Sequence, residues 1–151
     1  IKMVKRQKVQ IVIFREKEKT GYDVLLLKTN KRRGSFWQNV TGGVETSDLN
    51  LLKAAEREVK EETSLSNLHV NNLNHQYSFI DQWNTDVTES LFFVKVSYKD
   101  SLDIKISTKE HEEFKWLDIK SVQVNDYRFE TNFDAFECAL NFLNKENSME
   151  H

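Results

Sequence analysis

WQNVTGGVETSDLNLLKAAEREVKEETSL, which runs from Trp37 to Leu65, is the stretch that decides the fold of this 151-residue chain. Its second half has the apolar periodicity of an amphipathic helix from Leu49 to about Thr63. Two of the chain's four glycines, Gly42 and Gly43, stand directly before that helix. The helix is also crowded with glutamates, and like charges three or four residues apart repel by about 0.2–0.5 kcal/mol per pair. The crowding therefore needs a physical reason.

The predicted helix separates into two faces. Its apolar stripe is made of Leu52, Ala55 and Val59. On the roughly opposite face lie three acidic residues, Glu58, Glu61 and Glu62. Ser47 or Asp48 is expected to cap the amino end of the helix. The acidic face is either a solvated surface, the common case for this spacing, or a site for a hard divalent cation, which prefers carboxylate oxygen.

The rest of the chain predicts a mixed α/β fold. Lys8–Phe14 and Asp23–Leu27 are apolar, β-branched runs that lie close enough to form an antiparallel hairpin. Further elements are predicted as strands at Phe36–Thr41, His69–Ile80, Thr88–Tyr98 and Glu113–Leu117, a turn of helix at Asp118–Val122 and a second amphipathic helix at Asn132–Lys145. The polar tail, Glu146–His151, is expected to fray. This order indicates a mixed β-sheet sandwiched between α-helices in a single domain, residues 1–151, whose core spans about residues 5–145.

Composition argues against several classes of protein. The net charge of −2 leaves no basic excess with which to recruit nucleic acid. No apolar run reaches the length of a membrane span, and no secretory signal pattern is present. Cys138 is the only cysteine and is expected to be a small buried side chain on a helix, which favours a reducing compartment. A cytoplasmic location is therefore expected, and the chain is expected to be a monomer or a homodimer.

The context of the glutamates decides between the two readings of the acidic face. The Gly-Gly pair, the helix and the run from Arg57 to Glu62 (REVKEE) together resemble the Nudix box of the Nudix hydrolases. That pattern runs G, five residues, E, seven residues, R-E-U-x-E-E-x-G-U, where U is aliphatic. Counted from Gly42, this chain departs from it in three places: Asp48 stands at the position of the first Glu, one extra residue precedes Arg57, and Ser64 replaces the late glycine.

The resemblance extends beyond the box. The segments WQNVTGGVE, TES at Thr88–Ser90 and KEHEEFKWLD at Lys109–Asp118 are similar to the bacterial dihydroneopterin triphosphate pyrophosphohydrolases, a Nudix subfamily. This resemblance implies the Nudix fold, Mg²⁺ as the cofactor with Mn²⁺ as a possible substitute, and a set of metal ligands: Glu58, Glu61, Glu62 and Glu110. The catalytic residues that it implies are Glu58, Glu61 and Arg57. Arg57 is expected to orient the glutamates, in part through Asp48.

Some assignments remain open within this resemblance. Glu112 and Glu113 are rivals to Glu110 as the late metal ligand. The expected substrate-binding residues are Lys5, Lys28, Arg32 and Thr41 for the phosphates and other polar groups, with Phe79 and Phe129 for the flat base. Tyr77, Trp83 and the loop residues Lys31 and Arg33 are further candidates. Trp37 and Trp116 are assigned to packing, and His111 is expected to be a loop histidine.

The function implied is Mg²⁺-dependent hydrolysis of dihydroneopterin triphosphate to the monophosphate and pyrophosphate, a step of folate biosynthesis. The partner is then a small-molecule polyphosphate, with no nucleic acid and no membrane. Alternative substrates are dATP, an oxidised purine triphosphate or a dinucleoside polyphosphate. A different class remains open, a non-catalytic Nudix-fold nucleotide-binding regulator, although such modules typically lose the box glutamates that this chain keeps.

Overall fold

The computed structural model describes residues 5–100 and 103–149. Within them the strands are β1 (Lys5–Glu16), β2 (Tyr22–Thr29), β3 (Trp37–Gln38), β4 (Val40–Gly43), β5 (Val70–Ile80), β6 (Asp86–Val96) and β7 (His111–Asp118). The helices are α1 (Leu51–Thr63) and α2 (Glu130–Met149), with 3-10 turns η1 (Lys31–Arg33) and η2 (Val124–Asp126). Neither α1 nor α2 has the length and hydrophobicity that crossing a bilayer requires.

The strands form one mixed sheet in the order β3-β2-β1-β6-β5. β1 pairs with β6 in parallel, and the other pairs are antiparallel, including the predicted hairpin of β1 and β2. One edge of β1 is divided between two partners. Its first half pairs with β4, from Lys8 opposite Gly43 to Ile11 opposite Val40, and its last residues pair with β2. The sheet therefore forks beside β4, directly before α1 in the chain.

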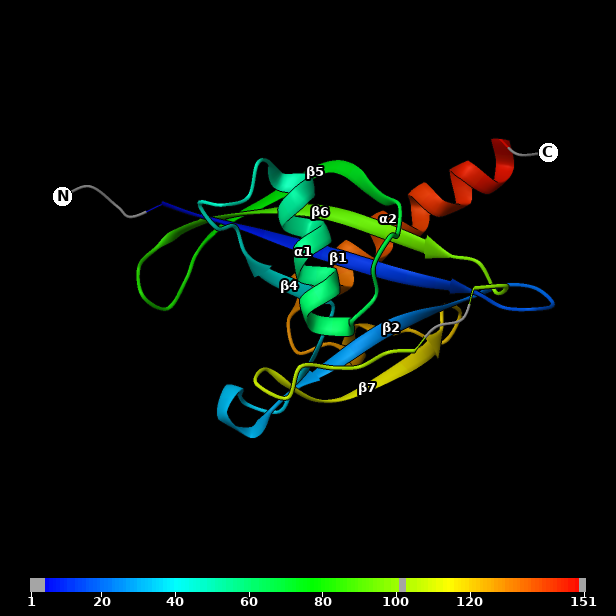
Figure 1. Cartoon of the computed structure of the whole chain (residues 1–151), viewed down its shortest axis with the longest axis horizontal. Coiled ribbons are helices and arrows are strands. Elements are labelled where there is room, and N and C mark those ends of the chain that lie inside the picture. The colour runs from blue at the N-terminus through cyan, green and yellow to red at the C-terminus, as the bar shows by residue number, and fades with distance from the viewer. Residues whose placement is uncertain (1–4, 101–102, 150–151) are drawn as a thin grey trace.

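The two helices cover opposite faces of the sheet, with α1 in front of it and α2 behind it in the view of Figure 1. Alternate residues of β1 build the two cores. Val9, Ile11 and Ile13 pack with Ala54, Ala55 and Val59 of α1. Val12 and Phe14 pack with Ala135, Phe136, Ala139 and Leu143 of α2. The predicted mixed sheet between α-helices is confirmed.

The amino end of α1 differs from the prediction. The helix begins at Leu51, and its cap is Asn50, whose side-chain oxygen accepts the N–H of Lys53 at 2.8 Å, so neither Ser47 nor Asp48 is the cap. Leu52 is 37% exposed and does not belong to the buried stripe. The residues that α1 buries are Ala54, Ala55, Glu58, Val59, Glu62 and Thr63. Two of the glutamates thus adjoin the buried apolar face, and the prediction that all three lie opposite that face is wrong.

Other boundaries also shift. The predicted strand Phe36–Thr41 is interrupted at Asn39, and both glycines of the pair belong to β4. Asp118–Val122 is a turn, closed by the N–H of Ser121 on the carbonyl of Asp118 at 2.9 Å, and helical geometry comes later, in η2. The second helix continues to Met149, so the predicted fraying of residues 146–149 is wrong. Residues 150–151 of that tail lie outside the described residues.

A chain of buried polar side chains holds β4 at the fork. The amide of Gln10 donates to Glu89 at 2.8 Å and accepts from Asn39 at 2.7 Å. The backbone N–H of Asn39 donates to the side chain of Asn132 at 2.9 Å. Because paired buried amides favour one arrangement, this chain ties β1, β6 and the start of α2 to the short segment that leads into β4.

Candidate active site

The glycine pair provides room for a glutamate of α1. Glu58 is 7% exposed, and its carboxylate lies directly over Gly42. A Cβ atom added to Gly42 would lie 2.0 Å from Cδ of Glu58, far inside van der Waals contact. A side chain at position 42 is thus incompatible with the observed place of Glu58. This close approach explains why a glycine stands before the acidic helix.

Arg57 connects the glutamates to the loop that precedes α1. Its Nε and Nη2 donate to the two carboxylate oxygens of Asp48, each at 2.9 Å, and Nη2 also donates to the carbonyl of Gly43 at 2.8 Å. Its Nη1 donates to Glu58 at 2.9 Å and to Glu61 at 3.2 Å. The predicted contact with Asp48 is confirmed, despite the extra residue in the box. The guanidinium lowers the pKa of Asp48 through these hydrogen bonds.

Glu58 and Glu62 resist ionisation in the absence of a cation. Burial raises the pKa of Glu58 to about 7, against the opposing hydrogen bond and charge of Arg57. Glu62 is fully buried, and burial raises its pKa well above the ordinary value, with the charges of Glu58 and Glu110 acting in the same direction. Neither carboxylate oxygen of Glu62 accepts a hydrogen bond from a described residue. Unpartnered buried carboxylate oxygens fit a divalent cation, which prefers oxygen ligands and would stabilise the ionised form.

Glu110 and His111 complete this group from another part of the chain. One ligand atom each of Glu62, Glu110 and His111 lies within 4.8 Å of the others. His111 is the first residue of β7 and is 1% exposed, so the prediction of a loop histidine is wrong. Burial lowers its pKa to about 4, and the nearby Arg33 acts in the same direction. The rivals of Glu110 have other contacts, since Glu112 accepts from Ser35 at 2.7 Å and Glu113 lies 3.9 Å from Lys28.

An open cleft of about 400 Å³ gives access to these carboxylates. It is lined by Arg6, Lys8, Arg33, Thr41, Gly42, Gly43, Val44, Glu45, Glu58, Glu61 and Glu110. Its acidic residues come mainly from α1 and the segment before β7, and its basic residues come from β1 and η1. Of the three cations that line the cleft, sequence reasoning named Arg33 as a further candidate and missed Arg6 and Lys8. The spacing of two residues between Arg6 and Lys8, which places both on one face of a strand, is the signal that could have found that pair.

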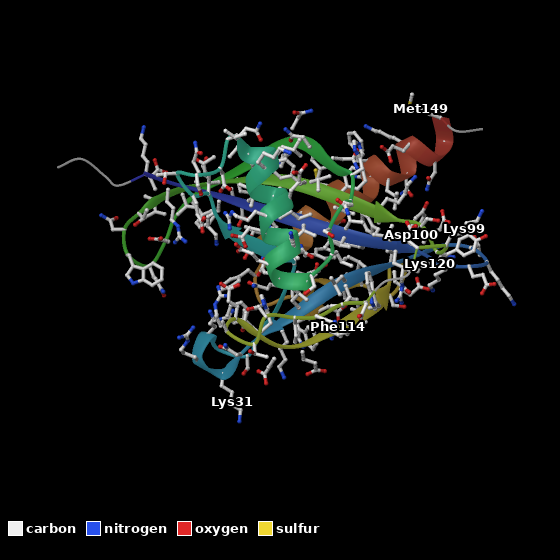
Figure 2. All side chains as sticks on the ribbon, in the orientation of Figure 1. Lys31, Lys99, Asp100, Phe114, Lys120 and Met149 are labelled. Atoms are coloured by element: carbon white, nitrogen blue, oxygen red, sulfur yellow. The ribbon has the colours of Figure 1, made fainter. Side chains whose placement is uncertain are left out.

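The predicted phosphate-binding residues divide into two groups. Thr41 lines the cleft, whereas Lys5, Lys28 and Arg32 are not among its lining residues. The Nζ of Lys28 lies 3.9 Å from Glu113, and Arg32 donates to the carbonyl of Lys109 at 3.2 Å. Lys31 points away from the body of the molecule at the outer side of η1 (Figure 2). The basic loop therefore contributes one cation, Arg33, to the cleft wall.

The predicted aromatic contacts also lie outside the cleft lining. Phe79 is 37% exposed on β5, and Phe129 is 47% exposed with its ring against Phe36 at 5.3 Å between centroids. Trp83 is 71% exposed in the turn between β5 and β6. The packing role of Trp37 and Trp116 is confirmed, since each packs against a core cluster. Cys138 is half-buried beside the α2 core, less buried than expected.

Solved structures with this fold are numerous. A NUDIX hydrolase from Listeria monocytogenes is 22% identical, with a TM-score of 0.77 over 92% of this chain and 94% of that one. The E. coli dihydroneopterin triphosphate pyrophosphohydrolase is 27% identical, with a TM-score of 0.70 over 90% and 96%. A C. elegans Ap4A hydrolase is 18% identical, with a TM-score of 0.75 over 93% and 98%. Among curated proteins none matches this sequence.

The sequence itself matches a family description over most of its length. Residues 4–136 match the NUDIX domain. The match includes the glycine pair, all of α1, and the segment that carries Glu110 and His111. The chain therefore belongs to the NUDIX domain family.

Proposed function

We propose that this protein is a Mg²⁺-dependent pyrophosphohydrolase that cleaves a nucleoside triphosphate-type substrate into a monophosphate and pyrophosphate. The observation that carries the proposal is the division of charge in the cleft. Glu58, Glu61 and Glu110 line it together with Arg6, Lys8 and Arg33. A polyphosphate chain needs both kinds of residue, because carboxylates hold the cation that it approaches and basic side chains bind its outer oxygens.

Glu58, Glu62 and Glu110 would hold the divalent cation, with Glu61 at the edge of the set. The two buried members, Glu58 and Glu62, have raised pKa values that a cation would lower again. When bound, such a cation neutralises phosphate charge and lowers the pKa of water in its coordination sphere. Mn²⁺ is a reasonable substitute, because it accepts the same oxygen ligands.

The other side chains orient, bind and move protons. Arg57 holds Glu58 and Glu61 through one nitrogen while Asp48 and Gly43 fix the rest of its guanidinium. This arrangement makes Arg57 a positioning group for the carboxylates. The side chain of Glu61 is 57% exposed at the cleft, where it is placed to accept a proton from the attacking water.

We further propose dihydroneopterin triphosphate as the substrate, which would place the enzyme in folate biosynthesis. The support is the 27% identity to the E. coli dihydroneopterin triphosphate pyrophosphohydrolase over nearly the full length of both chains. Because Phe79 and Phe129 are partly exposed but do not line the cleft, a base-binding role for either needs the substrate to extend beyond the phosphate site.

The test is pyrophosphate release with Mg²⁺ from dihydroneopterin triphosphate, beside dATP, 8-oxo-dGTP and diadenosine tetraphosphate. Glu58→Gln and Glu61→Gln are the inactivating variants. Glu56→Gln is the matched control, because Glu56 lies on the same helix, pairs with Lys53 at 3.1 Å and does not line the cleft.

The expected result is the highest kcat/KM for dihydroneopterin triphosphate, with activity lost in the first two variants and kept in the third. A higher kcat/KM for another substrate contradicts the folate assignment and leaves the reaction class standing. If the wild type binds nucleotides and hydrolyses none of them, the enzymatic proposal fails, and a nucleotide-binding regulator becomes the better description.

A further inference from the structure

The buried imidazole of His111 has no role in the function proposed above. Its Nε2 lies 3.5 Å from Oε1 of Glu62, and the ring is 1% exposed. His111 does not line the cleft, whereas Glu58 and Glu110 do. A ring in this place is out of reach of a substrate, so any contribution that it makes to the reaction must pass through Glu62.

Glu62 needs a hydrogen-bond donor if it is to hold a cation in one orientation. Both of its oxygens are buried, and neither accepts a hydrogen bond from a described residue. A carboxylate that coordinates a metal is ordinarily oriented by a hydrogen bond of its own. The nitrogen that the structure places beside Oε1 is Nε2 of His111. The observed separation must close by about 0.5 Å to reach a normal N–H···O distance.

The surroundings of the ring favour the tautomer that can make this bond. A neutral imidazole carries one N–H, on Nδ1 or on Nε2. The amide nitrogen of Gln38 lies 3.4 Å from Nε2, whereas Nδ1 has no hydrogen-bond partner among the described residues. An amide nitrogen only donates, so a protonated Nε2 requires the Gln38 amide to turn by half a rotation and present its oxygen. After that rotation, the Glu62 carboxylate and the Gln38 amide oxygen can both accept a hydrogen bond from Nε2–H. An N–H on Nδ1 would be buried without an acceptor among the described residues. A proton on Nε2 satisfies the ring better than one on Nδ1.

We propose that His111 is a positioning residue for the metal site: its Nε2–H donates to Oε1 of Glu62 and thereby directs Oε2 toward the cation that Glu58 and Glu110 also hold. The inference rests on the proposed metal-dependent function. His111 comes from β7 and Glu62 from α1, so this contact also fixes the distance between the acidic helix and the segment that carries Glu110.

The test is Mn²⁺ binding to the whole protein without substrate, followed by electron paramagnetic resonance. His111→Leu removes the donor and keeps an apolar side chain in the buried space. His111→Gln keeps an N–H donor near the place of Nε2. We expect the Kd for Mn²⁺ to rise by about 10- to 100-fold in His111→Leu. In His111→Gln we expect it to remain close to the wild-type value, while the metal-free melting temperature of the leucine variant is no lower than that of the glutamine variant.

Each other outcome overturns the proposal in a recognisable way. Equal Kd values for the wild type and His111→Leu refute the positioning role and leave the proposed function standing. Equal weakening in both variants, with lower melting temperatures, shows that the ring serves only packing. Nitrogen hyperfine coupling to Mn²⁺ in pulsed spectra of the wild type shows that His111 is itself a ligand. A wild type that binds no Mn²⁺ refutes the proposed metal-dependent function, and this inference with it.

Discussion

Replacing Gly42 by alanine tests the site by moving one ligand and little else. The added Cβ would lie 2.0 Å from Cδ of Glu58 and 2.2 and 2.3 Å from its two oxygens. Ordinary contact begins at 3.4 Å, so the carboxylate must retreat by about 1.4 Å. Because the atoms in the way are the far end of a flexible side chain, the fold should lose only about 1–2 kcal/mol of stability.

The effect on catalysis should be much larger than the effect on stability. A displacement of about 1 Å at a reacting centre can cost about 100-fold in rate, which corresponds to about 2.7 kcal/mol of transition-state stabilisation. We therefore expect Gly42→Ala to lower kcat/KM for pyrophosphate release by at least about 100-fold. We expect the Kd for Mn²⁺ to rise as well, with a melting temperature only a few degrees lower than that of the wild type.

Gly43→Ala is the comparison that isolates the steric cause. Its Cβ would meet only the guanidinium of Arg6, at 3.3 Å, which a small movement of a flexible side chain relieves. Its loss of kcat/KM should be under about tenfold. The reasoning is refuted if Gly42→Ala keeps wild-type activity, or if both alanine variants lose activity to the same extent.

Three further predictions follow from the site and the helix end. In the metal-free protein, the pKa of Glu58 is about 7 in the folded state against 4.5 in the unfolded state, so the folded state binds the proton more tightly and the free energy of unfolding should fall as pH rises from about 5 to 8. Allowing for solvent screening, we expect urea unfolding to show a fall of about 2 kcal/mol over this range. A free energy of unfolding that does not change with pH in the metal-free protein would contradict the assignment. Saturating Mg²⁺ should remove that fall. Asp48→Asn should lower both the melting temperature and the affinity for Mn²⁺, because Arg57 loses its bidentate anionic partner. If calorimetry and metal titration give wild-type values, the Asp48–Arg57 pair is dispensable. Ser64→Gly should change the melting temperature little, because two effects oppose each other. Glycine adopts the left-handed φ of 68° without strain, which gains about 1 kcal/mol, and loss of the hydrogen bond from the Ser64 hydroxyl to the carbonyl of Lys105 costs about as much. A shift of more than several degrees in thermal unfolding would show that one effect dominates.

The acidic helix could be predicted from the sequence, but its buried face could not. Helical spacing and the run REVKEE are local features, and together they predict an acidic helix that ends at Thr63, as the structure has it. A helical wheel assigns apolar residues to the inside, which failed for Leu52, Glu58 and Glu62. What makes room for the buried Glu58 is the backbone of Gly42, a long-range contact that only the fold creates. The burial of charge is then balanced by Arg57 and, in our proposal, by a cation.

The basic residues show how sensitive a site prediction is to position within an element. Lys5 is predicted to bind phosphate, but its neighbour Arg6 lines the cleft instead. In the basic loop both Arg32 and Arg33 are candidates, and only Arg33 lines the cleft. On a strand, a shift of one residue moves a side chain to the other face, so adjacent cations have different roles although their chemistry is similar. Sequence similarity placed Glu110 correctly in the acidic group, because a motif carries its own register.

The parallel pairing of β1 with β6 also determines when this protein can fold during synthesis. The pairs run from Lys5 with Asp86 to Arg15 with Val96, so each joins residues roughly eighty positions apart. At about 5–20 residues per second, a ribosome needs roughly 4–16 s after β1 emerges to synthesise β6, the parallel partner of β1. During that interval the apolar run from Val9 to Phe14 has no neighbour on the edge that β6 will occupy. A nascent chain that ends before Asp86 should therefore aggregate or bind a chaperone, and a chain long enough to expose β6 outside the ribosome should lose that tendency.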